Sequence, residues 1–217
     1  MNWMDLVVRR RARVGTLGDP ATADEVWLVI HGYGQLVSEF LPACDGLVGP
    51  TRAVVAPEAL NRFYKVPEGH QGTHATVPVG TTWMTREHRL AEIADYVDYL
   101  DDVVEATRRP GARLVVLGFS QGVTTVARWV SQGRTRVDRV VCWAGELPKD
   151  VDLVATRDRW PADAVDLVVG VRDEFREWIG LERQVERFAA GGVTARITEF
   201  AGGHRLDRAT LRMLADR

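Results

Sequence analysis

The sequence predicts an α/β protein in which a mostly parallel β-sheet is covered by helices on both faces. Short continuous apolar runs, typical of buried parallel strands, alternate along the chain with amphipathic stretches. In those stretches apolar residues recur every three or four positions, which indicates helices with one buried face. Neither repeats nor a linker divides the 217 residues. We therefore expect one domain, residues 1–217.

The apolar runs mark the expected strands. They cover residues 26–30, 53–56, 114–117, 137–144, 165–171 and 193–200. In the last run polar and apolar residues alternate, which suits a strand at the sheet edge. Residues 6–14 are expected to add an antiparallel strand at one edge of the sheet.

The clearest helical pattern runs from residue 87 to residue 107, where five apolar residues form one stripe. Further helices are expected at residues 121–132, 177–190 and 207–215. Residues 58–86 interrupt the alternation and show no period. A loop of that length in a compact domain is usually a lid or a binding loop, so we expect a lid-like loop.

Composition narrows the range of partners. Lys and Arg number 28 and Asp and Glu 30, so the net charge of −2 gives no bulk attraction to nucleic acid or to an anionic membrane. The cluster Arg9–Arg11 is interpreted as a solvated strand face. No apolar stretch reaches the length of a membrane span, and the N-terminus lacks the order of a signal peptide. Cys44 and Cys142 are interpreted as buried free thiols, and the protein as cytoplasmic.

The run Gly118-Phe119-Ser120-Gln121-Gly122 fits the G-x-S-x-G pattern of a nucleophile elbow. It follows an apolar strand directly and opens an amphipathic helix, which is the context that such an elbow requires. The glycines suit a strained, close-packed turn. Ser120 is therefore the candidate nucleophile, although serine also favours the N-cap of a helix.

A serine nucleophile needs a base and a carboxylate that orients the base. In proteins with a nucleophile elbow these two residues follow the serine in the order acid, then histidine. His204 is the only histidine after Ser120, so it is the candidate base. Asp173 follows the strand at 165–171 and should lie at the same sheet edge as Ser120. Asp163 and Asp166 lie at the other end of that strand. We therefore expect Asp173 to be the acid.

An oxyanion hole needs two backbone N–H donors, one from the residue after the nucleophile and one from the loop after an early strand, here the loop after residue 30. We assign its donors to the backbone N–H groups of Tyr33 and Gln121. His31 is interpreted as a structural hydrogen-bonding residue. The remaining histidines lack the spacing of metal ligands, and no full phosphate-binding fingerprint is present, so we expect neither a metal nor a cofactor.

His31-Gly32-x-Gly34, the Gly118–Gly122 run, Asp173 and Gly203-His204 resemble the carboxylesterase/phospholipase family that includes the acyl-protein thioesterases. The resemblance extends over nearly the whole chain and looks closest to a bacterial esterase branch. It implies an α/β-hydrolase fold with a minimal cap that hydrolyses carboxylic esters or thioesters without a cofactor.

Four residues of the long loop are hypothesised to line an apolar substrate groove, because this loop adjoins the site in related folds: Phe63, Tyr64, Trp83 and Met84. Packing of the loop onto the core is the alternative.

The predicted function is thus a serine carboxylic-ester hydrolase that acts on small or medium acyl esters through a Ser-His-Asp triad and an acyl-enzyme intermediate. A small-molecule ester is the expected partner; the sequence leaves a homodimer open. The alternatives are an acyl-thioesterase or lysophospholipase, and, from another class, a ligand-binding protein on a hydrolase scaffold.

Overall fold

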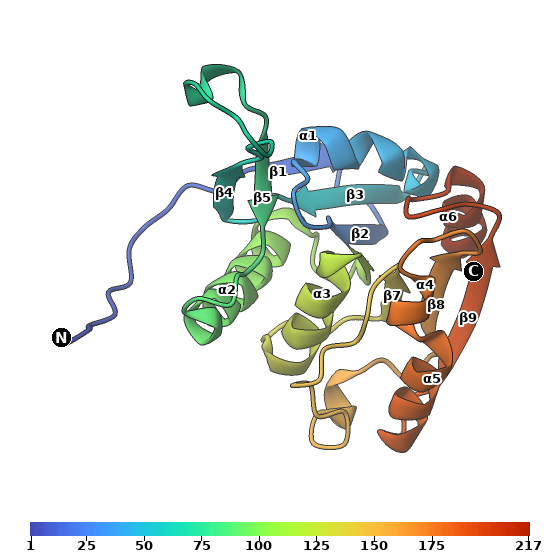
Figure 1. Cartoon of the computed structure of the whole chain (residues 1–217). Helices are drawn as coiled ribbons and strands as arrows, with labels where there is room; N and C mark the ends of the chain where they lie inside the picture. Colours follow the sequence, from blue (N-terminus) through green and yellow to red (C-terminus); the bar gives the residue numbers. More distant parts are fainter.

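A seven-stranded sheet forms the centre of the molecule (Figure 1). The structure is a computed structural model and describes residues 1–217. The strand order is β1-β3-β2-β6-β7-β8-β9, and every neighbouring pair is parallel except β1 and β3. The strands are β1 (Val14–Leu17), β2 (Glu25–Ile30), β3 (Arg52–Pro57), β6 (Arg113–Phe119), β7 (Arg139–Trp143), β8 (Val165–Gly170) and β9 (Ala195–Phe200). All six predicted apolar strands are confirmed, and β9 lies at the sheet edge as expected.

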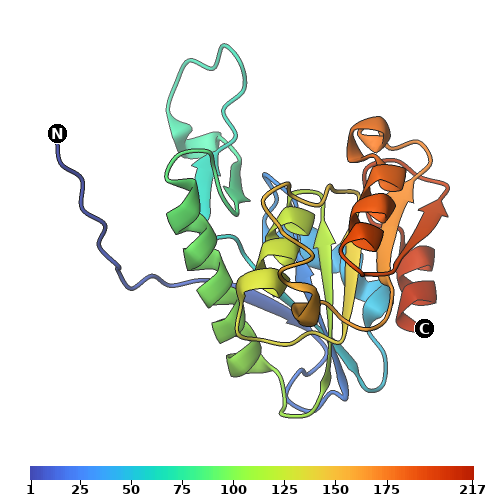
Figure 2. The ribbon, with the colours of Figure 1, turned by 90° about the horizontal axis from the view of Figure 1, so that it is seen from below.

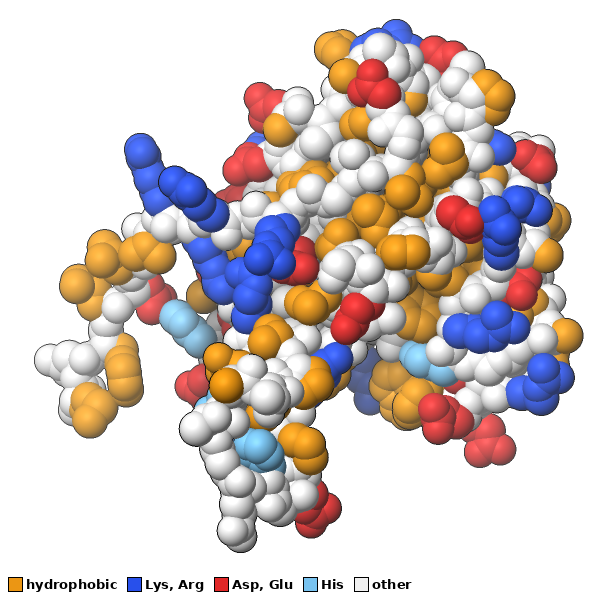
Figure 3. All heavy atoms as spheres, turned by 90° about the horizontal axis from the view of Figure 1, so that it is seen from above, with side chains coloured by type: hydrophobic (Ala, Val, Ile, Leu, Met, Phe, Trp, Pro, Cys, Tyr) orange, Lys and Arg blue, Asp and Glu red, His pale blue; other side chains and the backbone are white.

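The N-terminal edge strand begins later than the sequence predicts. An antiparallel edge strand is present, but it covers Val14–Leu17, whereas residues 1–13 have no regular structure. The reason lies in the partner strand: Val14 pairs with Pro57, which is the last residue of β3, so no strand remains for the earlier residues to pair with. Their hydrophobic side chains are consequently uncovered, on the arm at the left of Figure 3.

Helices cover both faces of the sheet. α2 (Arg89–Thr107), α3 (Gln121–Gln132) and α5 (Leu181–Ala190) lie on one face, and α1 (Val37–Phe40), the 3-10 helix η1 (Leu41–Leu47) and α6 (Arg208–Ala215) on the other (Figure 1). Two more 3-10 helices, η2 (His74–Thr76) and η3 (Arg157–Arg159), lie in loops. None of the helices combines the length and the apolar character needed to cross a bilayer. The layered α/β architecture predicted from the sequence is confirmed.

The helix predicted at residues 177–190 is divided in two. α4 (Arg176–Ile179) ends at Gly180, and α5 begins after it. Gly180 has φ 57°, in the left-handed region that ends a helix and that glycine adopts without strain. The break turns the short helix α4 away from the axis of α5.

The expected lid-like loop at residues 58–86 contains a small second sheet. β4 (Asn61–Tyr64) and β5 (Val79–Thr82) pair antiparallel. We call residues 61–84, which comprise the two strands, the segment between them and the two residues after β5, the flap. Between its strands, residues 65–78 project away from the body of the protein (Figures 1 and 2).

At the amino ends of β7 and β8 a buried carboxylate gathers three arginines. The Asp166 side chain is 0% exposed. It accepts hydrogen bonds from Arg139 at 2.9 and 2.6 Å and from Arg217 at 2.9 Å, and it pairs with Arg196 at 3.2 Å. This cluster joins Arg217 to β7 and β8, at the end of the sheet that lies away from Ser120.

Candidate active site

Ser120 lies in a sharp turn between β6 and α3. The strand ends at Phe119 and the helix begins at Gln121, so one residue makes the whole change of direction. Its backbone has φ 54° and ψ −118°, a conformation that costs a non-glycine residue about 1–3 kcal/mol. The N–H of Ser120 donates to the carbonyl of Trp143 at 2.8 Å, which anchors the turn to β7. The Ser120 side chain makes no N-cap hydrogen bond, so the capping alternative does not account for it.

The two glycines of the motif allow this turn to pack closely. A Cβ atom on Gly122 would lie 2.2 Å from the carbonyl oxygen of Ile30, and one on Gly118 would lie 2.4 Å from the carbonyl oxygen of Gly122. Both obstacles are backbone atoms, which cannot move aside as a flexible side chain could. The motif is therefore required by packing as well as by the position of Ser120.

Asp173 and His204 come from neighbouring loops at the same edge of the sheet. Asp173 follows β8, and its side chain is 0% exposed. One carboxylate oxygen lies 2.9 Å from His204 Nδ1, and the other accepts the backbone N–H of Phe175 at 2.9 Å. With Nδ1–H donating to the carboxylate, the Nε2 atom of a neutral His204 is left as an acceptor. A backbone bond from Arg172 N–H to the carbonyl of Gly202, 2.8 Å long, joins the two loops.

Two of the three residues, Ser120 and His204, meet at a cavity of about 360 Å³, whereas the buried Asp173 is not part of its lining. Ser120 and His204 line it, together with Ala144, Phe175 and Trp178. The His204 ring lies between two aromatic rings, with centroid distances of 5.0 Å to Phe119 and 4.8 Å to Phe175. No hydrogen bond joins the Ser120 hydroxyl to His204; such catalytic bonds often tighten only when substrate binds.

The predicted oxyanion donors belong to the loop after β2 and to the first turn of α3. The backbone N–H groups of Tyr33 and Gln121 take part in no hydrogen bond of the structure. For Gln121 this follows from its place as the first residue of α3, where helical N–H groups lack a partner. The loop around Tyr33 is held by the flap, because Gly34 N–H donates to the carbonyl of Thr81 at 2.8 Å and the Thr81 hydroxyl donates to the carbonyl of Gln35 at 2.6 Å.

His31 has the structural surroundings that the sequence suggested. Its Nδ1 atom lies 2.8 Å from the carbonyl of Gly32, and its Nε2 accepts the N–H of Ala59 at 3.1 Å. Burial lowers the pKa of His31 and favours the neutral ring that these two contacts require. The residue thus shapes the turn before Tyr33 without reaching the cavity beside Ser120, whose walls do not include it.

The four flap residues expected to line a groove separate into two groups. Phe63 stacks on Tyr33 with 5.1 Å between ring centroids, and Tyr64 is exposed and stacks on His74. Trp83 is 1% exposed, and its Nε1 donates to the carbonyl of His31. Here the chain leaves β5 and enters the core, so Trp83 supports the site from beneath. This corrects the expectation that it lines an open groove.

Met84 is half-buried, next to Trp83, and packs against the core. Its carbonyl accepts a hydrogen bond from the Gln121 side-chain amide at 3.3 Å, and the same side chain accepts the N–H of Trp83 at 3.3 Å. Neither Met84 nor the other three flap residues line the cavity at Ser120. Gln121 therefore connects the flap to the first turn of α3.

Sequence reasoning missed the two aromatic residues that do line this cavity. Phe175 and Trp178 follow Asp173 closely, and their side chains remain 44% and 60% exposed. The signal was present, since two large aromatic residues lie within five positions of the candidate acid. The sequence pattern places Trp178 within one predicted helix at 177–190, which hides its position beside the cavity. The break at Gly180 leaves it on the separate helix α4.

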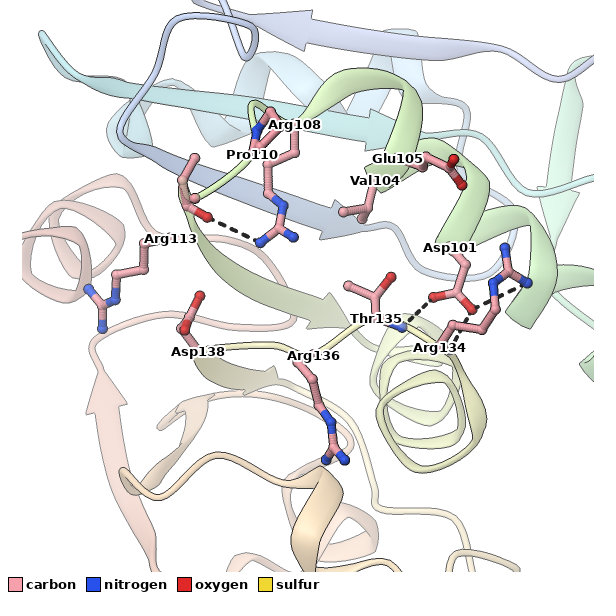
Figure 4. A pocket seen from close by; sticks show the side chains of 12 residues that line it. Asp101, Val104, Glu105, Arg108, Pro110, Arg113, Arg134, Thr135, Arg136 and Asp138 are labelled. Carbon is pink, nitrogen blue, oxygen red and sulfur yellow. Dashed lines mark hydrogen bonds and ion pairs between the residues drawn. The ribbon is translucent and has the colours of Figure 1, made fainter.

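A larger hollow, which we call the ion-paired hollow, lies elsewhere, at the amino ends of β6 and β7 (Figure 4). It measures about 730 Å³ and is lined mostly by charged side chains. Three of its arginines, Arg113, Arg134 and Arg136, form ion pairs with carboxylates at 2.8 to 3.3 Å. Their charges are compensated within the fold, so this hollow is a weaker candidate than the cavity at Ser120.

No protein-family model matches the chain, and no curated protein sequence matches it. Solved structures do. Esterase PE8 superposes with a TM-score of 0.67 at 20% identity, over 95% of this chain and 97% of that one. Zea mays acyl-protein thioesterase 2 gives 0.69 at 15% identity, with 95% and 97% covered. A carboxylesterase from Mesorhizobium loti gives 0.69 at 16% identity, with 94% of each chain covered. The chain has the α/β-hydrolase fold.

Proposed function

We propose that the protein is a serine hydrolase that cleaves carboxylic esters. The observation that carries the proposal is the cavity at which Ser120, in a strained turn, faces His204, whose Nδ1 lies 2.9 Å from a buried carboxylate. A hydroxyl becomes an effective nucleophile when an oriented base can take its proton. Esterase and thioesterase names among the structurally similar proteins support the same reaction class.

In the proposed reaction the Ser120 oxygen attacks the ester carbonyl carbon while its proton passes to His204 Nε2. The carbonyl oxygen takes up the electron pair and becomes an oxyanion, which the N–H groups of Tyr33 and Gln121 stabilise. Asp173 keeps Nδ1–H directed toward itself and stabilises the imidazolium.

The tetrahedral intermediate then collapses. The bond to the leaving oxygen breaks, that oxygen takes the proton from His204, and the acyl group remains on Ser120 as an ester. Water repeats the sequence: His204 takes its proton, the hydroxide attacks the acyl carbon, and Ser120 recovers the proton as the acid departs.

Hydrolysis of p-nitrophenyl esters and labelling by a fluorophosphonate probe test this proposal. We expect Ser120→Ala to abolish labelling and to lower kcat by at least about 10³-fold. Ser38→Ala is the matched control, since Ser38 is exposed and lies outside the cavity. Full activity in Ser120→Ala would refute the assignment, and an unlabelled wild-type protein would favour a ligand-binding role on the hydrolase scaffold.

Thioester hydrolysis is the second candidate reaction, and the similarity to the Zea mays acyl-protein thioesterase favours it. The same triad and oxyanion hole serve both substrates, because the attacked carbonyl is common to them. Rates on matched acyl esters, acyl thioesters and lysolipids separate a carboxylesterase from a thioesterase or a lysophospholipase.

A further inference from the structure

A second hollow, of about 530 Å³, adjoins the cavity at Ser120. The two share Trp178, which lines both. We call it the basic hollow because three of its side chains are cationic. Its lining is Glu146, Lys149, Trp178, Ile179, Gly180, Arg183, Gln184 and Arg187.

The cations of the basic hollow have no carboxylate partners, unlike the arginines Arg113, Arg134 and Arg136 of the ion-paired hollow. Lys149, Arg183 and Arg187 face one carboxylate, Glu146, and none of the four forms an ion pair. The two arginines are held by neutral acceptors. Arg187 donates to the carbonyl of Leu147 at 2.7 Å, and Arg183 donates to the carbonyl of Trp178 at 3.0 Å. The hollow therefore keeps an excess of positive charge toward solvent.

The basic hollow is fixed in place relative to Ser120. The segment from Ala144 to Lys149 leads from the wall of the catalytic cavity to the basic hollow. Buried Gln184 holds this segment, because its amide donates to the carbonyl of Gly145 at 3.2 Å and accepts the N–H of Leu147 at 3.0 Å. A substrate that fills the cavity and passes Trp178 therefore meets the cations at a defined distance from the scissile bond.

The chemistry of the triad indicates which part of the substrate lies there. His204 must give its proton to the leaving oxygen or sulfur, so the leaving group lies against the His204 ring. The walls beside that ring are Phe175 and Trp178, and both are substantially exposed. Exposed aromatic faces bind an apolar group well, whereas their negative π surface disfavours an anion.

We propose that the preferred substrates are esters whose alcohol part has an apolar portion followed by an anionic group, a carboxylate or a phosphate. The apolar portion lies between Phe175 and Trp178, and the anion binds Lys149 and Arg183 in the basic hollow. This inference rests on the proposed hydrolase function and adds the substrate class to it.

Three aryl acetates with nearly equal leaving groups test the inference: the acetate of 3-(4-hydroxyphenyl)propionate, its phosphonate analogue and its neutral primary amide. At low ionic strength we expect kcat/KM for at least one anionic ester to exceed that for the amide by about tenfold, equivalent to about 1.4 kcal/mol. Added salt should reduce the preference, because the hollow is open to solvent. Whichever of the two anionic esters is hydrolysed faster shows whether the basic hollow prefers a carboxylate or a phosphate-like group.

Lys149→Glu is the decisive variant. The exposed Lys149 side chain makes no hydrogen bond and no ion pair, the adjacent Asp150 being paired with Arg89 and Arg128, so replacing Lys149 removes no polar contact of the fold. We expect it to remove the tenfold preference. Arg212→Glu on α6 makes the same change of charge outside both hollows and should retain the preference.

Equal or faster hydrolysis of the amide by the wild-type protein would overturn the inference while leaving the proposed function intact. A preference that survives in Lys149→Glu would also overturn it. Failure to hydrolyse all three esters, with no fluorophosphonate labelling, would instead refute the hydrolase function and this inference with it.

Discussion

Replacing Asp173 by asparagine tests the triad most directly, because the shape of the side chain is kept and only its hydrogen-bonding character changes. Asp173 is fully buried and accepts two hydrogen bonds, from His204 Nδ1–H and from the N–H of Phe175. An asparagine has one accepting oxygen. If that oxygen stays on Phe175, the amide NH₂ faces His204 and forces the tautomer with its proton on Nε2, which cannot accept the proton of Ser120.

The opposite orientation of the amide is also unfavourable, since its NH₂ would then face the Phe175 N–H, and an unsatisfied buried donor costs about 1–3 kcal/mol. We therefore expect the inactive tautomer to dominate. In serine proteases the equivalent change lowers kcat by about 10⁴, which corresponds to about 5 kcal/mol of transition-state stabilisation. We expect a loss of 10³- to 10⁴-fold in Asp173→Asn on p-nitrophenyl esters.

The control for this experiment is Glu174→Gln, which makes the same chemical change one residue later on an exposed side chain. It should retain nearly full activity. Thermal unfolding of both variants shows whether the fold is kept, and circular dichroism at the assay temperature confirms it. A loss below tenfold in folded Asp173→Asn would refute the role of Asp173 and direct attention to another carboxylate.

Three further substitutions address the fold, two of them next to the site and one in the buried cluster of Asp166 at the other end of the sheet. Gly122→Ala would place its Cβ 2.2 Å from the carbonyl oxygen of Ile30, so we expect a loss of stability of about 1–3 kcal/mol in urea unfolding together with a loss of esterase activity. Burial lowers the pKa of His31, so below pH 6.5 the unfolded chain binds a proton that the folded chain does not. The free energy of unfolding should therefore decrease as the pH is lowered below 6.5, by at most about 1.4 kcal/mol per pH unit. His31→Gln should remove this contribution to the slope. Asp166→Asn leaves the buried charge of Arg139 without its counterion and should destabilise the protein by about 3–5 kcal/mol, whereas an unchanged urea midpoint would show that the pair contributes no net stability.

The sheet was predictable because its strands are buried on both faces and therefore read as continuous apolar runs. An antiparallel edge strand was also predicted, but the bounds of β1 were not, since its burial is slight and its limit is fixed by the point where β3 ends at Pro57. Nothing in residues 6–13 themselves marks that limit. The small flap sheet was hidden for a related reason: β4 and β5 have four residues each and bury little of their surface.

The candidate triad could be located from sequence because its members follow strands, and the carboxyl ends of parallel strands meet at one edge. Substrate-contacting residues obey no such rule. Trp83 and Trp178 are both tryptophans in connecting segments, yet one is buried beneath the oxyanion loop and the other is exposed beside His204. Their difference depends on how the flap enters the core and on the helix break at Gly180, which are tertiary features.

The sequence pattern described two connecting segments least well, the flap and the segment after Asp173. These two segments have different relations to the proposed substrate site. Thr81 of the flap holds the loop around Tyr33, so a change in the flap alters the position of the Tyr33 N–H as well as any contact that the flap makes. The segment after Asp173 presents aromatic faces at the catalytic cavity and, through Trp178, borders the basic hollow. In the proposed enzyme, one segment thus positions the oxyanion donor at Tyr33, whereas the other supplies the walls that contact the leaving group. Substitutions at Trp178 or Lys149 should change which ester is hydrolysed, whereas substitutions at Thr81 should slow the hydrolysis of every ester alike.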